Sequence, residues 1–155
     1  MGEALQHRLR MRPLADPVVE AMLNLLVTGA ALRELADAEY GRFGLTSSGY
    51  NVLRILRGSP DGLPRGEIGQ RLVNPAPDVT RLIDRLARRG LVRRHRGRTD
   101  RRLSLTRITP RGLALMEEAE AANRAQRDAL LASGLSLDEW RQVSDLCERI
   151  YGRLR

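Results

Sequence analysis

Apolar side chains recur three or four residues apart along most of the chain, which is the spacing of a helix with one buried face. This pattern predicts long helices over residues 17–40, 46–57, 76–89 and 110–131, and a last helix from Ser136 to Leu154. The protein is therefore expected to be mainly α-helical.

Capping signals agree with these helix positions. Asp16 before Pro17 and Thr109 before Pro110 are typical of helix starts, because the polar side chain accepts from the first free N–H groups and proline fits the first turn. Ser136 and Glu139 have the spacing of a capping box. The chain before Asp16 is polar and contains arginine, so residues 1–15 are expected to form a flexible or loosely packed arm.

A shorter helix is expected from Pro64 to about Leu72. It contains Gly66 and Gly69, each of which costs about 1 kcal/mol relative to alanine inside a helix. These glycines make the helix pliable or permit close contact with another helix, and the sequence alone leaves both readings open.

After Gly90 the helical period gives way to alternation. The runs 91–96 and 102–108 are rich in Leu, Val, Ile and Thr and flank the turn residues 97–100, which predicts a β-hairpin. Three helices followed by such a ribbon, with the third helix basic on its outer face, is the order of a winged helix-turn-helix. The expected fold class is mainly α with a small β-hairpin wing.

Charge is concentrated in this region. All 27 basic residues are arginine, against 19 acidic residues. Between Arg81 and Arg111 there are 12 arginines and only two acids, Asp84 and Asp100, so this segment carries +10 of a chain total of +8 and the rest sums to −2. Self-repulsion of this size is most simply offset by a polyanion such as nucleic acid.

Several function classes are disfavoured. No aromatic residue lies between Tyr50 and Trp140, which argues against base stacking on single strands and against an aromatic-anchored membrane helix. The longest uncharged apolar-rich run, 21–32, is too short to span a bilayer. One cysteine and two distant histidines offer no disulfide framework or metal site. No nucleophile–base pair or phosphate loop suggests an enzyme, and no cofactor or metal is expected.

Duplex DNA is therefore the expected partner, read by a helix in the major groove and an arginine-bearing hairpin. A sequence-specific regulator is the favoured function. A non-specific or architectural duplex-binding protein, which would use the same basic surface without a preferred palindrome, remains the alternative. The expected location is the cytoplasm, on the nucleoid.

Four motifs carry a resemblance to a known family. The segments are Asp78–Leu86 (DVTRLIDRL), Arg89–Arg94 (RGLVRR), Asp100–Arg102 (DRR) and Leu105–Gly112 (LTRITPRG). In this combination they closely resemble the MarR family of bacterial transcriptional regulators. The motifs lie between residues 72 and 112, while the order of helices resembles the family from about 17 to 155.

The resemblance implies a homodimer on a pseudo-palindromic operator. Dimerisation helices are expected at 16–44 and 110–155 and a DNA-binding lobe at 45–109, within one integrated domain. The family also implies a repressor released by a small, aromatic or anionic effector.

These expectations assign roles to individual residues. On the recognition helix the DNA-contacting candidates are Pro77, Asp78, Thr80, Arg81, Arg85 and Arg88. Arg81 is the expected guanine contact, with a phosphate contact or ion pairing to Asp78 or Asp84 as the alternative. Arg85 and Arg88 are expected on the DNA backbone or on Asp84. On the wing the candidates are Arg96, Arg98 and Arg101, braced by an ion pair between Asp100 and Arg102. Candidates for the effector pocket are Tyr40, Asn51 and Arg54.

Overall fold

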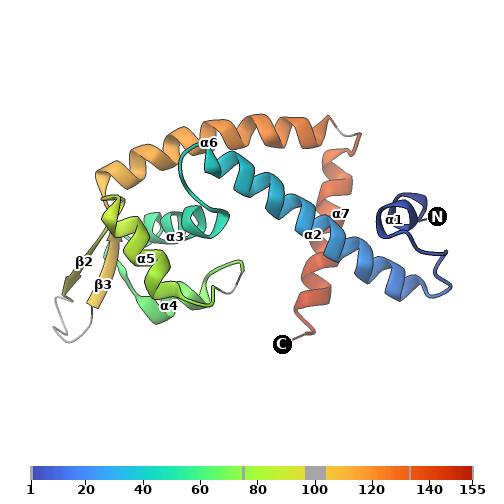
Figure 1. The fold of residues 1–155 in the computed structure, drawn as a ribbon, viewed down its shortest axis with the longest axis horizontal. Coiled ribbons are helices and arrows are strands. Elements are labelled where there is room, and N and C mark those ends of the chain that lie inside the picture. Colours follow the sequence, from blue (N-terminus) through green and yellow to red (C-terminus); the bar gives the residue numbers. More distant parts are fainter. Residues whose placement is uncertain (1, 75, 97–103, 133, 155) are drawn as a thin grey trace.

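The computed structural model of the chain describes residues 2–74, 76–96, 104–132 and 134–154. Figure 1 shows an elongated molecule with a small lobe at one end, from which two long helices extend. The elements in order are α1 (Glu3–Leu9), α2 (Pro17–Gly41), α3 (Ser47–Arg57), β1 (Leu63–Pro64), α4 (Arg65–Gln70), α5 (Val79–Arg88), β2 (Val92–Arg96), β3 (Ser104–Ile108), α6 (Pro110–Leu131) and α7 (Leu137–Tyr151).

The lobe is a winged helix, as expected from the sequence. Helices α3, α4 and α5 pack beside an antiparallel sheet of order β1-β3-β2, in which Leu63 pairs with Thr106 and Val92 pairs with Ile108. The third strand, β1, was not predicted. It has only two residues, too few to show an alternating pattern, and it exists because β3 offers it an edge.

The hydrophobic core lies in this lobe. Its largest fully buried side chains come from α3, α4, α5, the residue before β2, and α6: Val52, Leu53, Leu56, Ile68, Ile83, Leu86, Leu91 and Met116. The first half of α6 thus belongs to the lobe, while its second half runs out to α7 (Figure 1).

Two predicted helix starts need correction. The helix expected from Ala76 begins at Val79, because the Asp78 carboxylate accepts from the backbone N–H of Arg81 and caps the helix. Pro77 and Asp78 therefore precede the recognition helix. The short helix begins at Arg65 because Pro64 belongs to β1.

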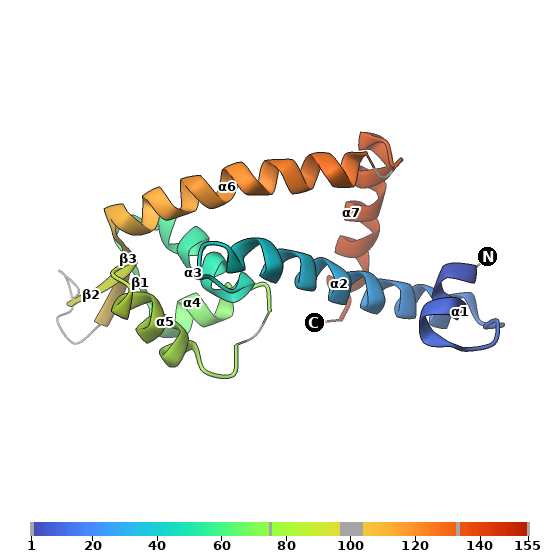
Figure 2. The same cartoon turned by 45° about the horizontal axis from the view of Figure 1, so that its top comes forward.

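The segment expected as a flexible arm contains the short helix α1. Leu5 is 4% exposed, and Gly2 lies against the Glu20 side chain in the first turn of α2. Figure 2 shows α1 folded back beside the start of α2. A seven-residue helix with one buried leucine has too short an apolar pattern to be distinguished from a polar arm.

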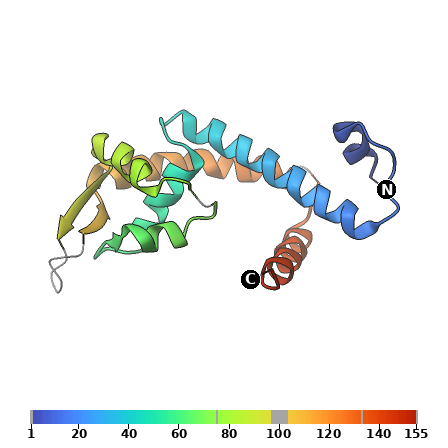
Figure 3. The same ribbon diagram turned by 60° about the horizontal axis from the view of Figure 1, so that its bottom comes forward.

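Helices α2 and α7 carry a large uncovered apolar surface. None of the 25 residues of α2 is buried. Figure 3 shows α7 turning off the far end of α6 to one side of the long helices, and Figure 2 shows α2 and α6 diverging as they leave the lobe. The exposed apolar side chains of α2 are Val18, Val19, Met22, Leu25, Leu26, Leu32 and Leu35, and those of α7 are Leu137, Val143, Leu146, Ile150 and Tyr151. Surfaces of this size mark an interaction site.

The capping box at the start of α7 is confirmed. Glu139 Oε2 accepts from the backbone N–H and the hydroxyl of Ser136, at 2.7 and 2.8 Å, and Ser136 Oγ accepts from the N–H of Glu139 at 3.2 Å. The backbone and then the side-chain hydrogen bond from Ser136 lower the pKa of the Glu139 carboxyl. This pair stabilises α7 above the ordinary glutamate pKa, and the contribution is lost as the pH falls through the lowered pKa.

Replacing Ser136 with alanine is expected to raise the pKa of Glu139 toward its ordinary value, because one of its two donors is removed. NMR titration of the Glu139 carboxyl in both proteins measures the shift. An unchanged pKa in the variant would show that the hydroxyl does not stabilise the carboxylate.

Candidate nucleic-acid interface

Helix α5 has one buried and one exposed face. Leu82, Ile83 and Leu86 are buried against the lobe. Arg81, Arg85 and Arg88 are exposed on the other side. The separation follows from the helical repeat, and it leaves three cations on the outer surface of one short helix.

The residues at the start of α5 have defined partners. Asp78 caps the helix, and its carboxylate also lies 4.0 Å from Nε of Arg81, whose side chain is 88% exposed. Thr80 Oγ1 accepts a hydrogen bond from Nη1 of Arg65 at 2.8 Å. Pro77 is exposed in the turn that leads into the helix.

Asp84 pairs with the wing rather than with its own helix. Its Oδ1 lies 2.6 Å from Nη2 of Arg94 on β2. Arg85 instead donates from Nη2 to Thr46 Oγ1 at 3.2 Å, at the start of α3. The sequence placed arginines of α5 as partners of Asp84, but it could not show that β2 passes closer to this carboxylate.

The wing is joined to the lobe by a second ion pair. Arg107 on β3 lies 3.1 Å from Asp61 in the turn before β1. Of the predicted wing residues, Arg96 is exposed at the end of β2. Arg98, Asp100, Arg101 and Arg102 lie outside the described residues, so their expected roles, including the bracing pair, stay predictions. The Asp84–Arg94 and Asp61–Arg107 ion pairs join the two wing strands to α5 and to the turn before β1.

Removing the Asp84 carboxylate is expected to weaken DNA binding, although the change makes the surface more positive. Asp84→Ala frees Arg94 and releases β2 from α5. Since both side chains are partly exposed, the pair contributes about 1 kcal/mol or less, so we expect about a twofold to fivefold loss of operator affinity in a fluorescence anisotropy titration. The control is Asp138→Ala, which removes an exposed carboxylate on α7 that pairs with Arg141. Tighter binding by Asp84→Ala would contradict the positioning role.

The recognition helix is also fixed at its C-terminal end. The Arg89 guanidinium donates to the carbonyl oxygens of Phe43, at 2.8 Å, and Gly44, where α2 turns into α3. Arg65, Arg89 and Arg94 were not singled out from the sequence. For Arg89 and Arg94 a signal existed in the RGLVRR motif, of which they are the first and last residues, whereas Arg65 was only one member of an arginine-rich chain.

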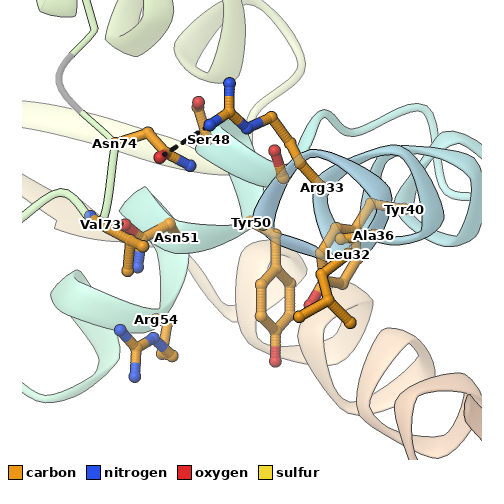
Figure 4. Close-up of a pocket in the computed structure, with 12 residues that line it drawn as sticks. Leu32, Arg33, Ala36, Tyr40, Ser48, Tyr50, Asn51, Arg54, Val73 and Asn74 are labelled. Carbon is orange, nitrogen blue, oxygen red and sulfur yellow. Dashed lines mark hydrogen bonds between the residues drawn. The ribbon is translucent and has the colours of Figure 1, made fainter. Parts of the chain in front are cut away.

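The three predicted effector residues line one cavity. Figure 4 shows this pocket of about 540 Å³ between α2, α3 and the segment after α4, with Tyr40, Asn51 and Arg54 on its walls. The rings of Tyr40 and Tyr50 stack with centroids 4.2 Å apart. Asn51 is also structural, because its Oδ1 accepts from the backbone N–H of Val73 at 2.9 Å. Arg33 and Arg54 are charged lining residues, and the lining contains no acid.

Arg33 links this pocket to the exposed arginines of α5. It also lines a second cavity of about 720 Å³ that reaches Arg81, Arg85 and Arg88. Its Nη2 donates to Asn74 Oδ1 at 3.4 Å, in the segment that leads to α5. The carboxylate of Asp37, one turn further along α2, accepts from the backbone N–H of Ser47 at 2.6 Å. Helix α2 therefore contacts the chain at two points before α5: at Ser47, where α3 begins, and at Asn74, in the segment after α4.

Among the described residues, no helix combines the length and hydrophobicity that a bilayer crossing requires. Within the same residues, no group of three or more His, Cys, Asp or Glu side chains is placed to hold a metal ion.

Known proteins are similar to this chain in sequence and in architecture. The profile of the MarR family matches residues 43–103, which contain the helix-turn-helix and the start of the wing. The chain is 27% identical over 137 residues to the HTH-type transcriptional regulator MhqR of Bacillus subtilis, covering 86% of this chain and 93% of that protein.

Solved structures extend the likeness to the outer helices. Sco5413, a MarR family transcriptional regulator from Streptomyces coelicolor, superposes with a TM-score of 0.76 at 28% identity, over 89% of this chain and 95% of that one. The PcaV transcriptional regulator of Streptomyces coelicolor, in complex with its natural ligand, has the same fold, with a TM-score of 0.72 at 24% identity over 93% of this chain and all of that one. These relatives are transcriptional regulators rather than enzymes. The helix-turn-helix segment 43–103 matches the MarR family model, and over most of its length the chain is similar to transcriptional regulators of that type.

Proposed function

We propose that the protein is a repressor that binds a pseudo-palindromic operator as a homodimer and is released by a small anionic molecule. The observation that carries the DNA-binding part is the outer face of α5. Arg81, Arg85 and Arg88 are exposed there, and the Asp84–Arg94 pair holds the wing beside them. Arginine recognises guanine and phosphate through paired N–H donors.

Dimerisation is supported by the uncovered apolar surfaces of α2 and α7. Covering them with a second copy removes this surface from water, which is the main favourable term in association. We accordingly assign residues 16–44 and 110–155 to dimerisation and 45–109 to DNA binding, with the first half of α6 also packing into the core of the lobe through Met116 and Ala119. A two-fold axis through these helices places two recognition helices about one DNA turn apart.

The pocket of Figure 4 supports a ligand with a flat ring and a carboxylate. Two arginines and no acid line it, so its potential favours an anion. The Tyr40–Tyr50 stack gives it an aromatic wall. PcaV, which has the same fold, was solved with its natural ligand bound. A carboxylate that draws Arg33 away from Asn74 frees the segment before α5, and this is our proposed route of release.

Selection of bound sequences from random duplex DNA at about 150 mM salt tests the DNA-binding part, since phosphate contacts depend strongly on salt. We expect a two-fold symmetric motif, and a dimer by analytical ultracentrifugation at micromolar concentration. Binding without a symmetric motif would support an architectural role instead. A stable monomer would overturn the dimer.

The ligand class is tested with benzoate, using benzyl alcohol as the uncharged control. We expect benzoate to release operator DNA and benzyl alcohol to do so much less. Arg54→Ala is expected to raise the benzoate concentration needed by about threefold to tenfold, because a charge-assisted hydrogen bond is lost at an exposed site. Equal release by both compounds, or an unchanged response of Arg54→Ala, would contradict an anion-binding pocket.

A further inference from the structure

We propose that Arg65 makes Thr80 a selective hydrogen-bond donor, so that this pair reads a keto base, guanine or thymine, at one position of each half-site. The inference rests on the proposed reading of duplex DNA by α5. It adds a specificity-determining residue outside the recognition helix, at the first residue of α4.

The hydrogen bond between the two side chains sets the direction of the hydroxyl. Nη1 of Arg65 donates to Thr80 Oγ1 at 2.8 Å. A threonine hydroxyl has one proton and two acceptor sites. Arginine has no acceptor, so the proton of Thr80 cannot point back at Arg65 and is directed to another partner.

Thr80 lies where base edges are read. It is the second residue of α5, whose capping residue is Asp78, and the N-terminal residues of a recognition helix are the ones nearest the bases. The cavity at this point has a volume of about 520 Å³ and is lined by both Arg65 and Thr80. A group that approaches the start of α5 therefore meets the hydroxyl and the guanidinium together.

The glycines of α4 allow Arg65 to reach Thr80. A Cβ on Gly69 would lie only 3.3 Å from Cγ2 of Val79, so the missing side chain lets α4 approach the first turn of α5. At Gly66 nothing lies within 4 Å of a Cβ position, which leaves the surface beside Arg65 open. Of the two roles that the sequence left open for these glycines, close contact with another helix applies to Gly69, whereas Gly66 faces open space.

The chemistry of the major groove turns this geometry into a base preference. Guanine presents the acceptors N7 and O6, and thymine presents O4, whereas cytosine presents the N4 amino donor. An unrestrained threonine hydroxyl can serve either kind of edge. With one acceptor site taken by Arg65, whose positive charge favours a base acceptor over the cytosine amino donor, the hydroxyl acts mainly as a donor and favours the keto bases over cytosine.

The test is selection from random duplex DNA by the full-length wild type, Arg65→Ala, Thr80→Val and the double variant. In the wild type we expect one position in each half-site to favour guanine or thymine over cytosine by about threefold to tenfold, the range of a single hydrogen bond. Arg65→Ala is expected to flatten that position and leave the others intact. In the Thr80→Val background, Arg65→Ala should cause no further change in preference.

The matched control is Arg71→Ala, which removes one cation from the C-terminal end of α4, where Arg71 pairs with Glu67, and leaves Thr80 untouched. Thermal unfolding checks that each variant is folded, and Thr80→Ser, which keeps the hydroxyl, should retain the preference. Uniform weakening by Arg65→Ala with every base preference intact would overturn the proposal and assign Arg65 to a phosphate. If the wild type selects no motif at all, the proposed function fails rather than this inference.

Discussion

Gly112→Ala is expected to destabilise the protein by about 3 kcal/mol, the upper part of the range for forcing extra atoms into a packed site. A Cβ at this position would overlap the carbonyl oxygen of Leu91 and lie 2.8 Å from Cγ1 of Ile108. The carbonyl oxygen cannot move easily, because Leu91 is 1% exposed and this carbonyl accepts from the backbone N–H of Thr109 at 3.0 Å. Thermal and urea unfolding of the purified variant measure the loss.

The matched control is Gly66→Ala, where a Cβ meets nothing within 4 Å. This change should leave stability unchanged or raise it by about 0.5–1 kcal/mol, the gain of replacing a glycine inside a helix. If both variants unfold like the wild type, the close approach of α6 to Leu91 is not as the structure has it.

Arg81→Ala is expected to lower affinity for the preferred operator by about 10-fold to 100-fold while changing affinity for unrelated duplex far less. The Arg81 side chain is 88% exposed and lies no closer than 4.0 Å to the Asp78 carboxylate, so little has to be broken before it bonds to a guanine. A bidentate contact of this kind supplies about 1–3 kcal/mol of discrimination. Anisotropy titrations with operator and scrambled duplex at the same salt measure both affinities.

Arg88→Ala is the comparison for this prediction. Arg88 is the last residue of α5, far from the end that is nearest the bases, and its loss should weaken both duplexes alike and reduce the salt dependence. If Arg81→Ala behaves in the same uniform way, Arg81 contacts a phosphate rather than a base.

The TPRG motif illustrates how much of the fold the sequence contains. Thr109 before Pro110 predicted a helix start, and the structure confirms it, with Thr109 Oγ1 accepting from the N–H of Gly112 at 3.1 Å. The same hydroxyl lies 2.7 Å from the carbonyl oxygen of Gly90. This second contact ties α6 to the turn before the wing, and no local pattern could indicate it because the two segments are 19 residues apart.

The elements missed by the sequence were short or depended on distant partners. Strand β1 needs the edge of β3, and helix α1 needs the first turn of α2. The long helices were predicted well because each repeats its apolar pattern over several turns.

For the candidate site too, the sequence predicted some features and not others. The exposed arginines of α5 follow from helical periodicity alone. Their partners do not, since Asp84 bonds to Arg94 on a strand and Arg85 to Thr46 on the turn before α3. The three pocket residues meet only because α2 and α3 fold against each other. Side-chain roles that depend on two elements therefore required the structure.

Helix α2 and the lobe are expected to differ in how readily their backbone hydrogen bonds open. The DNA-binding lobe contains most of the buried core, so its amides should exchange with solvent deuterium only in rare, nearly global openings. No residue of α2 is buried within its own chain, so in the proposed homodimer we expect the protection of its amides to rise with protein concentration. In that assembly one end of the molecule has a stability of its own, and the other acquires much of its stability from the second copy.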